Sequence, residues 1–254
     1  MYIDAHIHAD TRSYEDFEKM AISGIVKAIT CAHDVYRMSS ADVYLDHYDR
    51  LLRIETKRAR DNDLELYVAL GIHPSGIPKG WNELLEKLSK LLNERYVVAI
   101  GEVGLENASD VEEKILEKQV DLAVEKDMPV IAHTPKKNKT EIAERILKIV
   151  EVKGIEQTKI MIDHASKDLV ERLMDTDVYI GLTIQPPSKL THKQAAEIIK
   201  EYGSSKFILN SDISSIPSDP LAIPRSVIEM RKMGIPKKDI QRACYENASN
   251  LFDI

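Results

Sequence analysis

Residues 2–8 read YIDAHIH, and this short stretch decides how the rest of the chain is interpreted. Its apolar residues predict a buried strand over Tyr2–Ile7. Side chains alternate along a strand with a period of two, so His6 and His8 point to the same face. Two imidazoles that converge from one strand end can bind a divalent metal ion. An isolated H-x-H pair is common, so the interpretation depends on what the other strands carry.

The length and composition are typical of a folded globular domain. The 254 residues are 43% hydrophobic and 30% charged, which is enough apolar material for a sizeable core. Barrels of this length are commonly single domains, and we expect residues 1–254 to form one domain. The net charge of −7 argues against a broad surface that coats nucleic acid. It leaves open a small phosphate-binding cleft, because bound metal ions would invert the local field.

Cysteine use and the N-terminal sequence predict a reducing, cytoplasmic location. The two cysteines, Cys31 and Cys244, are far apart and match no zinc-binding or CxxC spacing, so we expect reduced core thiols. The chain does not begin with a basic-then-apolar signal, and no apolar run approaches ~18 residues. We therefore expect no association with a membrane.

Short apolar runs alternate with longer amphipathic ones along the whole chain. The short runs are almost continuously apolar, as expected for parallel strands that are buried on both faces. Eight strands are predicted, over Tyr2–Ile7, Val26–Cys31, Leu66–Gly71, Val97–Gly101, Val130–Ala132, Ile160–Ile162, Val178–Leu182 and Phe207–Leu209.

Helical patterns fall between these strands. Trp81–Asn93 carries an i, i+3, i+4, i+7 apolar stripe, and Asp110 is a candidate cap for the helix that follows it. The predicted helices are Asp42–Arg60, Trp81–Asn93, Val111–Glu125, Glu141–Val152, Asp168–Met174, Thr191–Tyr202 and Leu221–Met233, with an extra C-terminal helix over Lys237–Phe252. The alternation predicts an α/β fold, namely a (β/α)8 TIM barrel, with a doubly wound open sheet as the alternative. No G-x-G-x-x-G follows the first strand, which disfavours the dinucleotide-binding version of that alternative.

Polar residues recur at the carboxyl ends of the predicted strands. In a barrel these ends open on one mouth, where active sites lie. Seven ionisable side chains from six strands would therefore converge on one cavity, namely His6, His8, His73, Glu102, His133, His164 and Asp212. This convergence favours a metal site over isolated structural histidines.

The residue types favour two divalent metal ions. Two ions that share a bridging carboxylate suit displacement at phosphorus or at a carbonyl, because they polarise the electrophile and lower the pKa of bound water to about 7. Glu102 stands alone on the fourth strand and is the candidate bridge. Asp212 is the candidate ligand or base for the nucleophilic water. Donors of these types suit several metals. We expect zinc, with manganese, iron, nickel or magnesium as alternatives.

Seven short motifs follow one another along the chain. They are DAHIH (4–8), GIHP (71–74), GEVGL (101–105), PVIAH (129–133), IDHAS (162–166), NSD (210–212) and ENASNLF (246–252). In this order, and over essentially the whole chain, they resemble the TatD family of metal-dependent hydrolases, a branch of the amidohydrolase-like barrels that includes deoxyribonucleases. Related amidohydrolases often bridge their metals with a carboxylated lysine, whereas this chain has Glu102 on the corresponding strand.

The resemblance implies a role for each site residue. One metal would be held by His6, His8, Glu102 and Asp212, and the other by Glu102, His133 and His164. Glu102 and Asp212 would be the catalytic residues. His73 would lie near the substrate phosphate.

Three positions depart from the family pattern. Family members often carry an arginine two residues after the fifth-strand histidine, where this chain has Pro135, so a planar phosphate clamp is missing. Asn210 stands where the last family motif has glutamate, and Glu106 stands where an aspartate follows the bridging glutamate. These departures affect groups that set substrate choice, so hydrolase chemistry is better supported than nuclease activity.

Loop residues near the mouth are further candidates for substrate contact. Three lysines after Pro135 could meet a phosphate as mobile point charges or form a solvated loop, namely Lys136, Lys137 and Lys139. We expect His33 and Asp34 to be a solvated pair, while Tyr36 and Arg37 are candidates to reach the cavity.

Three functions remain open from the sequence. The first is a TatD-type hydrolase in which metal-activated water attacks a phosphodiester, including the 3′ end of single-stranded DNA. The second keeps the site and changes the substrate to an amide, a lactone or another ester. The third is a barrel that binds metal without catalysis, which an open cluster disfavours because structural zinc sites are closed cages. The expected partner is a small-molecule or nucleic-acid-end substrate, and no heptad repeat indicates an oligomeric state.

Overall fold

The computed structural model describes residues 1–32 and 38–254. The sequence predictions for His33, Asp34, Tyr36 and Arg37 lie outside these residues. Eight strands pair side by side, all parallel, in the order of the chain. They are β1 (Tyr2–Ile7), β2 (Ile25–Cys31), β3 (Glu65–Leu70), β4 (Val97–Gly104), β5 (Val130–His133), β6 (Ile160–Ile162), β7 (Tyr179–Thr183) and β8 (Phe207–Asn210).

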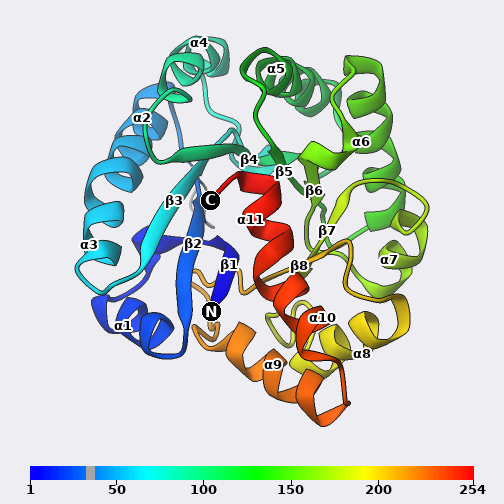
Figure 1. Ribbon diagram of the computed structural model, residues 1–254. Coiled ribbons are helices and arrows are strands. Elements are labelled where there is room, and N and C mark those ends of the chain that lie inside the picture. The colour runs from blue at the N-terminus through cyan, green and yellow to red at the C-terminus, as the bar shows by residue number, and fades with distance from the viewer. Residues whose placement is uncertain (33–37) are drawn as a thin grey trace.

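The sheet closes on itself between β1 and the segment that follows β8. Ile7 and Ile213 form a parallel bridge. The backbone N–H of Asp212 donates to the carbonyl of His6 at 2.9 Å, and that of His8 donates to the carbonyl of Ile213 at 2.8 Å. The fold is the predicted (β/α)8 TIM barrel, with its helices arranged around the strands (Figure 1).

Helices connect the strands and cover the barrel. They are α1 (Tyr14–Ile22), α2 (Ala41–Asp49), α3 (Thr56–Arg60), α4 (Trp81–Leu91), α5 (Asp110–Lys126), α6 (Lys139–Lys153), α7 (Lys167–Leu173), α8 (His192–Tyr202), α9 (Ala222–Lys232), α10 (Lys237–Gln241) and α11 (Asn247–Phe252). A π-helical segment joins α2 to α3 at Arg50–Glu55, and another joins α10 to α11 at Arg242–Glu246. In the described part of the chain, no helix has both the length and the apolar character needed to cross a membrane.

Two predictions about the helices need correction. Helix α1 was not expected, because only Phe17 and Met20 of its nine residues are buried, too few to make a periodic stripe. The cap of α5 is Ser109 rather than Asp110, since the Ser109 side chain accepts a hydrogen bond from the backbone of Glu112. Asp110 is the first helical residue, where its negative charge still favours the helix N-terminus.

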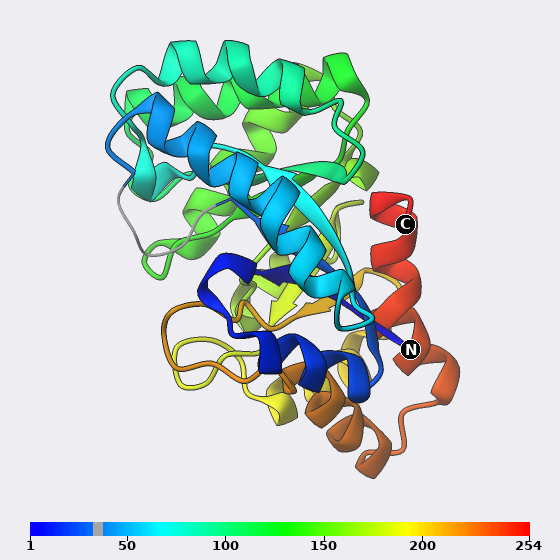
Figure 2. The same cartoon turned by 90° about the vertical axis from the view of Figure 1, so that its left-hand side faces the viewer.

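The C-terminal helix closes one end of the barrel. Ala248, Leu251 and Phe252 of α11 pack against apolar side chains of the barrel strands, among them Ile3 and Met161. Figure 1 shows α11 lying across the middle of the barrel, and Figure 2 shows it beside the N-terminus, at the end where the strands begin. This apolar packing leaves the opposite end, where the strands finish, for a polar site.

Candidate metal centre

All seven predicted site residues meet at the carboxyl ends of the strands. A cavity of about 1200 Å³ opens at this end. His6 is fully buried beneath it. The other six side chains line it, namely His8, His73, Glu102, His133, His164 and Asp212.

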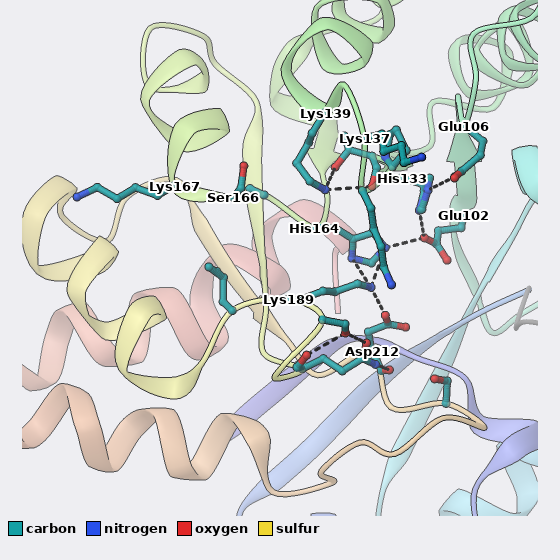
Figure 3. Close-up of a pocket in the computed structure, with 18 of the residues that line it drawn as sticks. Glu102, Glu106, His133, Lys137, Lys139, His164, Ser166, Lys167, Lys189 and Asp212 are labelled. Carbon is teal, nitrogen blue, oxygen red and sulfur yellow. Dashed lines mark hydrogen bonds and ion pairs between the residues drawn. The ribbon is translucent and has the colours of Figure 1, made fainter.

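Glu102 is the centre of the cluster, and Figure 3 shows it facing His133 and His164. Its Oε1 lies 3.0 Å from His133 Nδ1 and 3.0 Å from His164 Nε2. Its Oε2 lies 3.1 Å from His6 Nε2, and Oε1 is 3.8 Å from His73 Nε2. Because β4 runs on to Gly104, Glu102 lies within the strand rather than after it. His8 Nε2 lies 3.9 Å from Oε2, so one carboxylate has five imidazoles around it.

The backbone lets β4 and β5 approach closely beside this carboxylate. Gly104 has a φ of +141°, and a Cβ there would lie 2.6 Å from the carbonyl oxygen of His133. A side chain at this position would therefore push the two strands apart. The glycine keeps Glu102 and His133 within hydrogen-bond distance.

A second group of donors surrounds Asp212. Its Oδ1 lies 3.1 Å from His8 Nε2 and 3.8 Å from His6 Nε2. Its Oδ2 accepts a hydrogen bond from the ammonium of Lys189. The chain therefore brings His6 between the two carboxylates, Glu102 on one side and Asp212 on the other.

Asp163, for which the sequence predicted no role, contacts two of the site histidines, His6 and His164. It is fully buried, and its Oδ2 lies 2.7 Å from His6 Nδ1. Its Oδ1 accepts hydrogen bonds from three groups, namely the His164 backbone N–H, the Thr183 hydroxyl and the Asn210 amide. Asp163 fixes the His6 ring so that Nε2 faces the cavity floor. The IDHAS motif contains this carboxylate directly before His164, which was the available signal.

The donor set fits metal ions. Among the described residues, His6 Nε2 and His8 Nδ1 are buried without a hydrogen bond, although buried polar groups normally make one; His6 Nε2 instead lies 3.1 Å from the Glu102 carboxylate. Within residues 1–32 and 38–254, three groups of donor atoms are compact enough to hold an ion, namely His6, His8 and Asp212; His6, Asp163 and His164; and His73, Glu102 and His133. A mixed set of imidazoles and carboxylates suits zinc and its transition-metal neighbours.

Electrostatics favour ionised carboxylates and one neutral imidazole at this site, which are the forms that bind metal, whereas the pKa values of His6 and His133 are raised despite burial because carboxylates lie beside them. Burial alone would raise the pKa of Glu102, but His6 and His73 together with hydrogen bonds from His133 and His164 hold it well below its usual range. Burial also opposes ionisation of Asp212, and Lys189 outweighs it to lower that pKa. Burial and the nearby Lys189 charge lower the pKa of His164 to about 4. Carboxylates are thus ionised and this imidazole is neutral.

His73 lies against the cluster rather than out in the cavity. Its Nδ1 accepts a hydrogen bond from the backbone of Ser75 at 3.0 Å. Its ring packs edge-on against His133, with 4.5 Å between the ring centroids. This placement makes it a neighbour of Glu102, so its predicted role in substrate binding stays a prediction.

Three residues outside the predicted site join it, two from loops and one, Lys139, from the first turn of α6. Glu106 Oε2 lies 3.0 Å from His133 Nε2. Lys139 donates to Thr134 at the cavity wall, whereas Lys136 and Lys137 line the cavity but are exposed. Lys189 was not predicted, because it belongs to the loop after β7 and carries no motif.

Comparison with known proteins agrees with this geometry. A family model described as TatD related DNase matches residues 3–253. An uncharacterized metal-dependent hydrolase of Methanocaldococcus jannaschii is 49% identical over 250 residues, which cover 98% of this chain and 99% of the relative.

Solved structures share the fold. The crystal structure of a TatD-like protein from Archaeoglobus fulgidus has a TM-score of 0.85 at 26% identity and covers 100% of both chains. A phosphotriesterase homology protein from Escherichia coli, complexed with phosphate in its active site, has a TM-score of 0.77 at 15% identity and covers 99% of this chain and 98% of its own.

Proposed function

The chain belongs to the TatD related DNase family, and from this premise we propose that it is a metal-dependent hydrolase that uses two divalent ions to cleave a phosphodiester. The observation that carries the proposal is the Glu102 carboxylate, which is buried among five imidazoles at the open end of the barrel. A carboxylate in this position can bridge two ions. The ions would activate water and polarise the phosphoryl group when bound.

The remaining residues divide between holding the ions and handling the proton. His6, His8, Glu102 and Asp212 would hold one ion. Glu102, His133 and His164 would hold the other. Zinc is the first candidate, with manganese, iron, nickel or magnesium as alternatives.

Asp212 supplies the base. Its Oδ1 faces His8 and His6, whereas its Oδ2 faces Lys189 at the cavity. The low pKa of Asp212 keeps it ionised, so it can orient a water molecule and accept a proton from it. The adjacent ammonium of Lys189 would favour the negative charge that develops on the substrate.

A second candidate keeps the site and changes the substrate to a lactone, an amide or another ester. The observation that favours it is Pro135, which lines the cavity and offers no hydrogen-bond donor two residues after His133. A neutral substrate would not need a guanidinium there.

The test is a substrate panel on protein loaded with zinc or manganese. The panel contains bis(4-nitrophenyl) phosphate, single-stranded DNA with a free 3′ end, a γ-lactone and an anilide. Turnover of the phosphodiesters, lost in Asp212→Asn, is the expected result. Turnover of the lactone or anilide alone would replace the proposal by the second candidate. A protein that binds metal and gains thermal stability but turns over nothing would be a non-catalytic barrel.

The cellular setting follows from the substrate and the thiols. Cys31 and Cys244 are both buried free thiols, which supports a reducing compartment such as the cytoplasm. The partner would be a small phosphodiester or the end of a nucleic acid. The net charge of −7 favours the small substrate over a long polyanion.

A further inference from the structure

The Lys139 ammonium forms no direct ion pair in the described part of the chain, although the carboxylates of Asp163 and Glu106 attract it from a distance. It begins α6 at the cavity wall and is half-buried. Its Nζ donates to the carbonyl oxygen of Thr134 at 3.2 Å and to the hydroxyl Oγ1 of the same residue at 3.0 Å. Both partners are neutral. Burying an ammonium without a direct ion pair costs free energy, so an anion bound in the cavity would stabilise it.

A second ammonium, that of Lys189, is held beside the candidate metal centre by a hydrogen-bonded loop after β7. Leu190 donates to the carbonyl of Thr183 at 3.1 Å, and the Lys189 N–H donates to the carbonyl of Gln185 at 2.9 Å. The Gln185 side chain in turn donates to the carbonyl of Asp212 at 2.5 Å. The backbone of Lys189 is therefore anchored to the cavity floor, unlike an ammonium on a free surface loop.

The two ammonium groups face the same space. Lys189 Nζ lies 3.0 Å from His164 Nδ1 and contacts Asp212; Figure 3 shows it between these two residues. This charge affects the Lys139 ammonium. Burial first, and then repulsion by Lys189, lower the pKa of Lys139 to about 8. Two like charges at one cavity repel each other, and an anion bound between them would offset this repulsion.

We propose that Lys139 and Lys189 form a lysine clamp that binds the anionic phosphoryl oxygens of the substrate. The inference rests on the proposed function and narrows it: the substrate is an anionic phosphate ester, and neutral phosphotriesters and lactones are poor substrates. An ammonium is a compact point charge with three donors. Two of them, one from the start of α6 and one from the loop after β7, can reach different oxygens of a tetrahedral phosphoryl group, whereas a planar carboxylate offers two oxygens in one plane.

The binding experiment uses inorganic phosphate as the probe, titrated into zinc-loaded protein by calorimetry. Lys139→Met and Lys189→Met are each expected to weaken phosphate binding by about fivefold or more, and the corresponding arginine variants to retain most of it. Lys167→Met is the matched control. The Lys167 ammonium pairs with Glu201 at 3.0 Å and points away from the cluster (Figure 3), so phosphate affinity should not change. Metal content of every variant is measured, because Lys189 contacts Asp212.

The kinetic experiment compares an anionic with a neutral ester. For bis(4-nitrophenyl) phosphate, Lys139→Met should raise KM with little effect on kcat, whereas Lys189→Met should raise KM and also lower kcat, because Lys189 lowers the pKa of the proposed base Asp212. For diethyl 4-nitrophenyl phosphate, which carries no charge, Lys139→Met should leave kcat/KM unchanged. An equal loss on both esters would overturn the clamp, since the lysines would then act through the metal site. Benzoate that competes more strongly than phosphate would overturn the choice of a phosphoryl group.

The two proposals fail in different ways. If the wild type cleaves the diester but the methionine variants bind phosphate as tightly as the wild type, the clamp is wrong and the proposed function stands. If the wild type cleaves no ester but phosphate binding still falls in both variants, the clamp stands and the proposed function is wrong.

Discussion

The two ends of the barrel are built on the same eight strands and have opposite chemistry. At the end where the strands begin, Leu251 and Phe252 of α11 close the interior with apolar contacts. At the end where they finish, Glu102 and Asp212 lie among histidines in an open cavity. In barrels of this kind the first end contributes stability and the second carries the chemistry. The difference predicts that substitutions at the two ends affect different observables.

The largest effect is expected from the base at the open end. Asp212→Asn keeps the shape but removes the negative charge, so kcat should fall by about 10²–10⁴-fold. Single-turnover kinetics on the metal-loaded variant measures this loss. Asp168→Asn, which alters an exposed carboxylate in the first turn of α7, should retain full activity. An Asp212→Asn enzyme as active as the wild type would remove the proposed base.

Asp163 tests whether the support beneath the open end matters. Asp163→Asn replaces the acceptor at His6 Nδ1, 2.7 Å away, with an amide that can turn its donor toward the ring. We expect metal affinity to fall by about 10–100-fold. At saturating metal, kcat should recover most of its value, because the residue acts through His6. If kcat stays low although both metal sites are filled, Asp163 would take part in the catalytic step itself.

The closed end should affect stability alone. Phe252→Ala leaves a cavity beneath the barrel and should lower the free energy of unfolding by about 3–5 kcal/mol. Chemical denaturation measures this change, and activity per folded molecule should equal that of the wild type. Ile228→Ala, at a half-exposed position on α9, should change stability by no more than about 0.5 kcal/mol. A Phe252→Ala variant with normal stability but impaired activity would contradict the division between the two ends.

The smallest effect concerns pH at the rim of the cavity. Burial and Lys189 lower the pKa of Lys139 to about 8, so this ammonium is charged below pH 8 and loses its charge as the pH rises through 8. KM for an anionic ester should therefore increase by about fivefold between pH 7 and 9, the size of one partly exposed ion pair. Steady-state kinetics on Lys139→Arg supplies the control, since arginine stays charged and should show no such step. An identical step in that variant would assign the titration to another group.

The sequence predicted the barrel and the positions of most of its strands, because both depend on local signals. Apolar runs marked strands such as β1 and β6, whose bounds agree with the structure. His6, Glu102 and His164 could be placed together since parallel strands of a barrel all finish at one end. The early end predicted for the fourth strand was wrong, because Glu102 and Val103 continue β4 to Gly104.

What the sequence did not predict depends on contacts between distant segments. Asp163 has the same local appearance as any acid after a strand, and its role requires His6, 157 residues away. Lys189 reaches the site because the loop after β7 is anchored on the backbone of Asp212. Lys139 was one of three equivalent lysines in the sequence, and only burial against Thr134 separates it from its neighbours.

The most direct test of the account is the metal content of the purified protein, measured by elemental analysis for the wild type beside Glu102→Ala after incubation with zinc or manganese. The account predicts about two metal ions per chain in the wild type and a sharp fall in the variant, because Glu102 would bridge both ions. Asp168→Asn should keep the wild-type content. A wild type that binds no metal, or a Glu102→Ala variant that keeps both ions, would contradict the bridged centre on which the proposed hydrolysis depends.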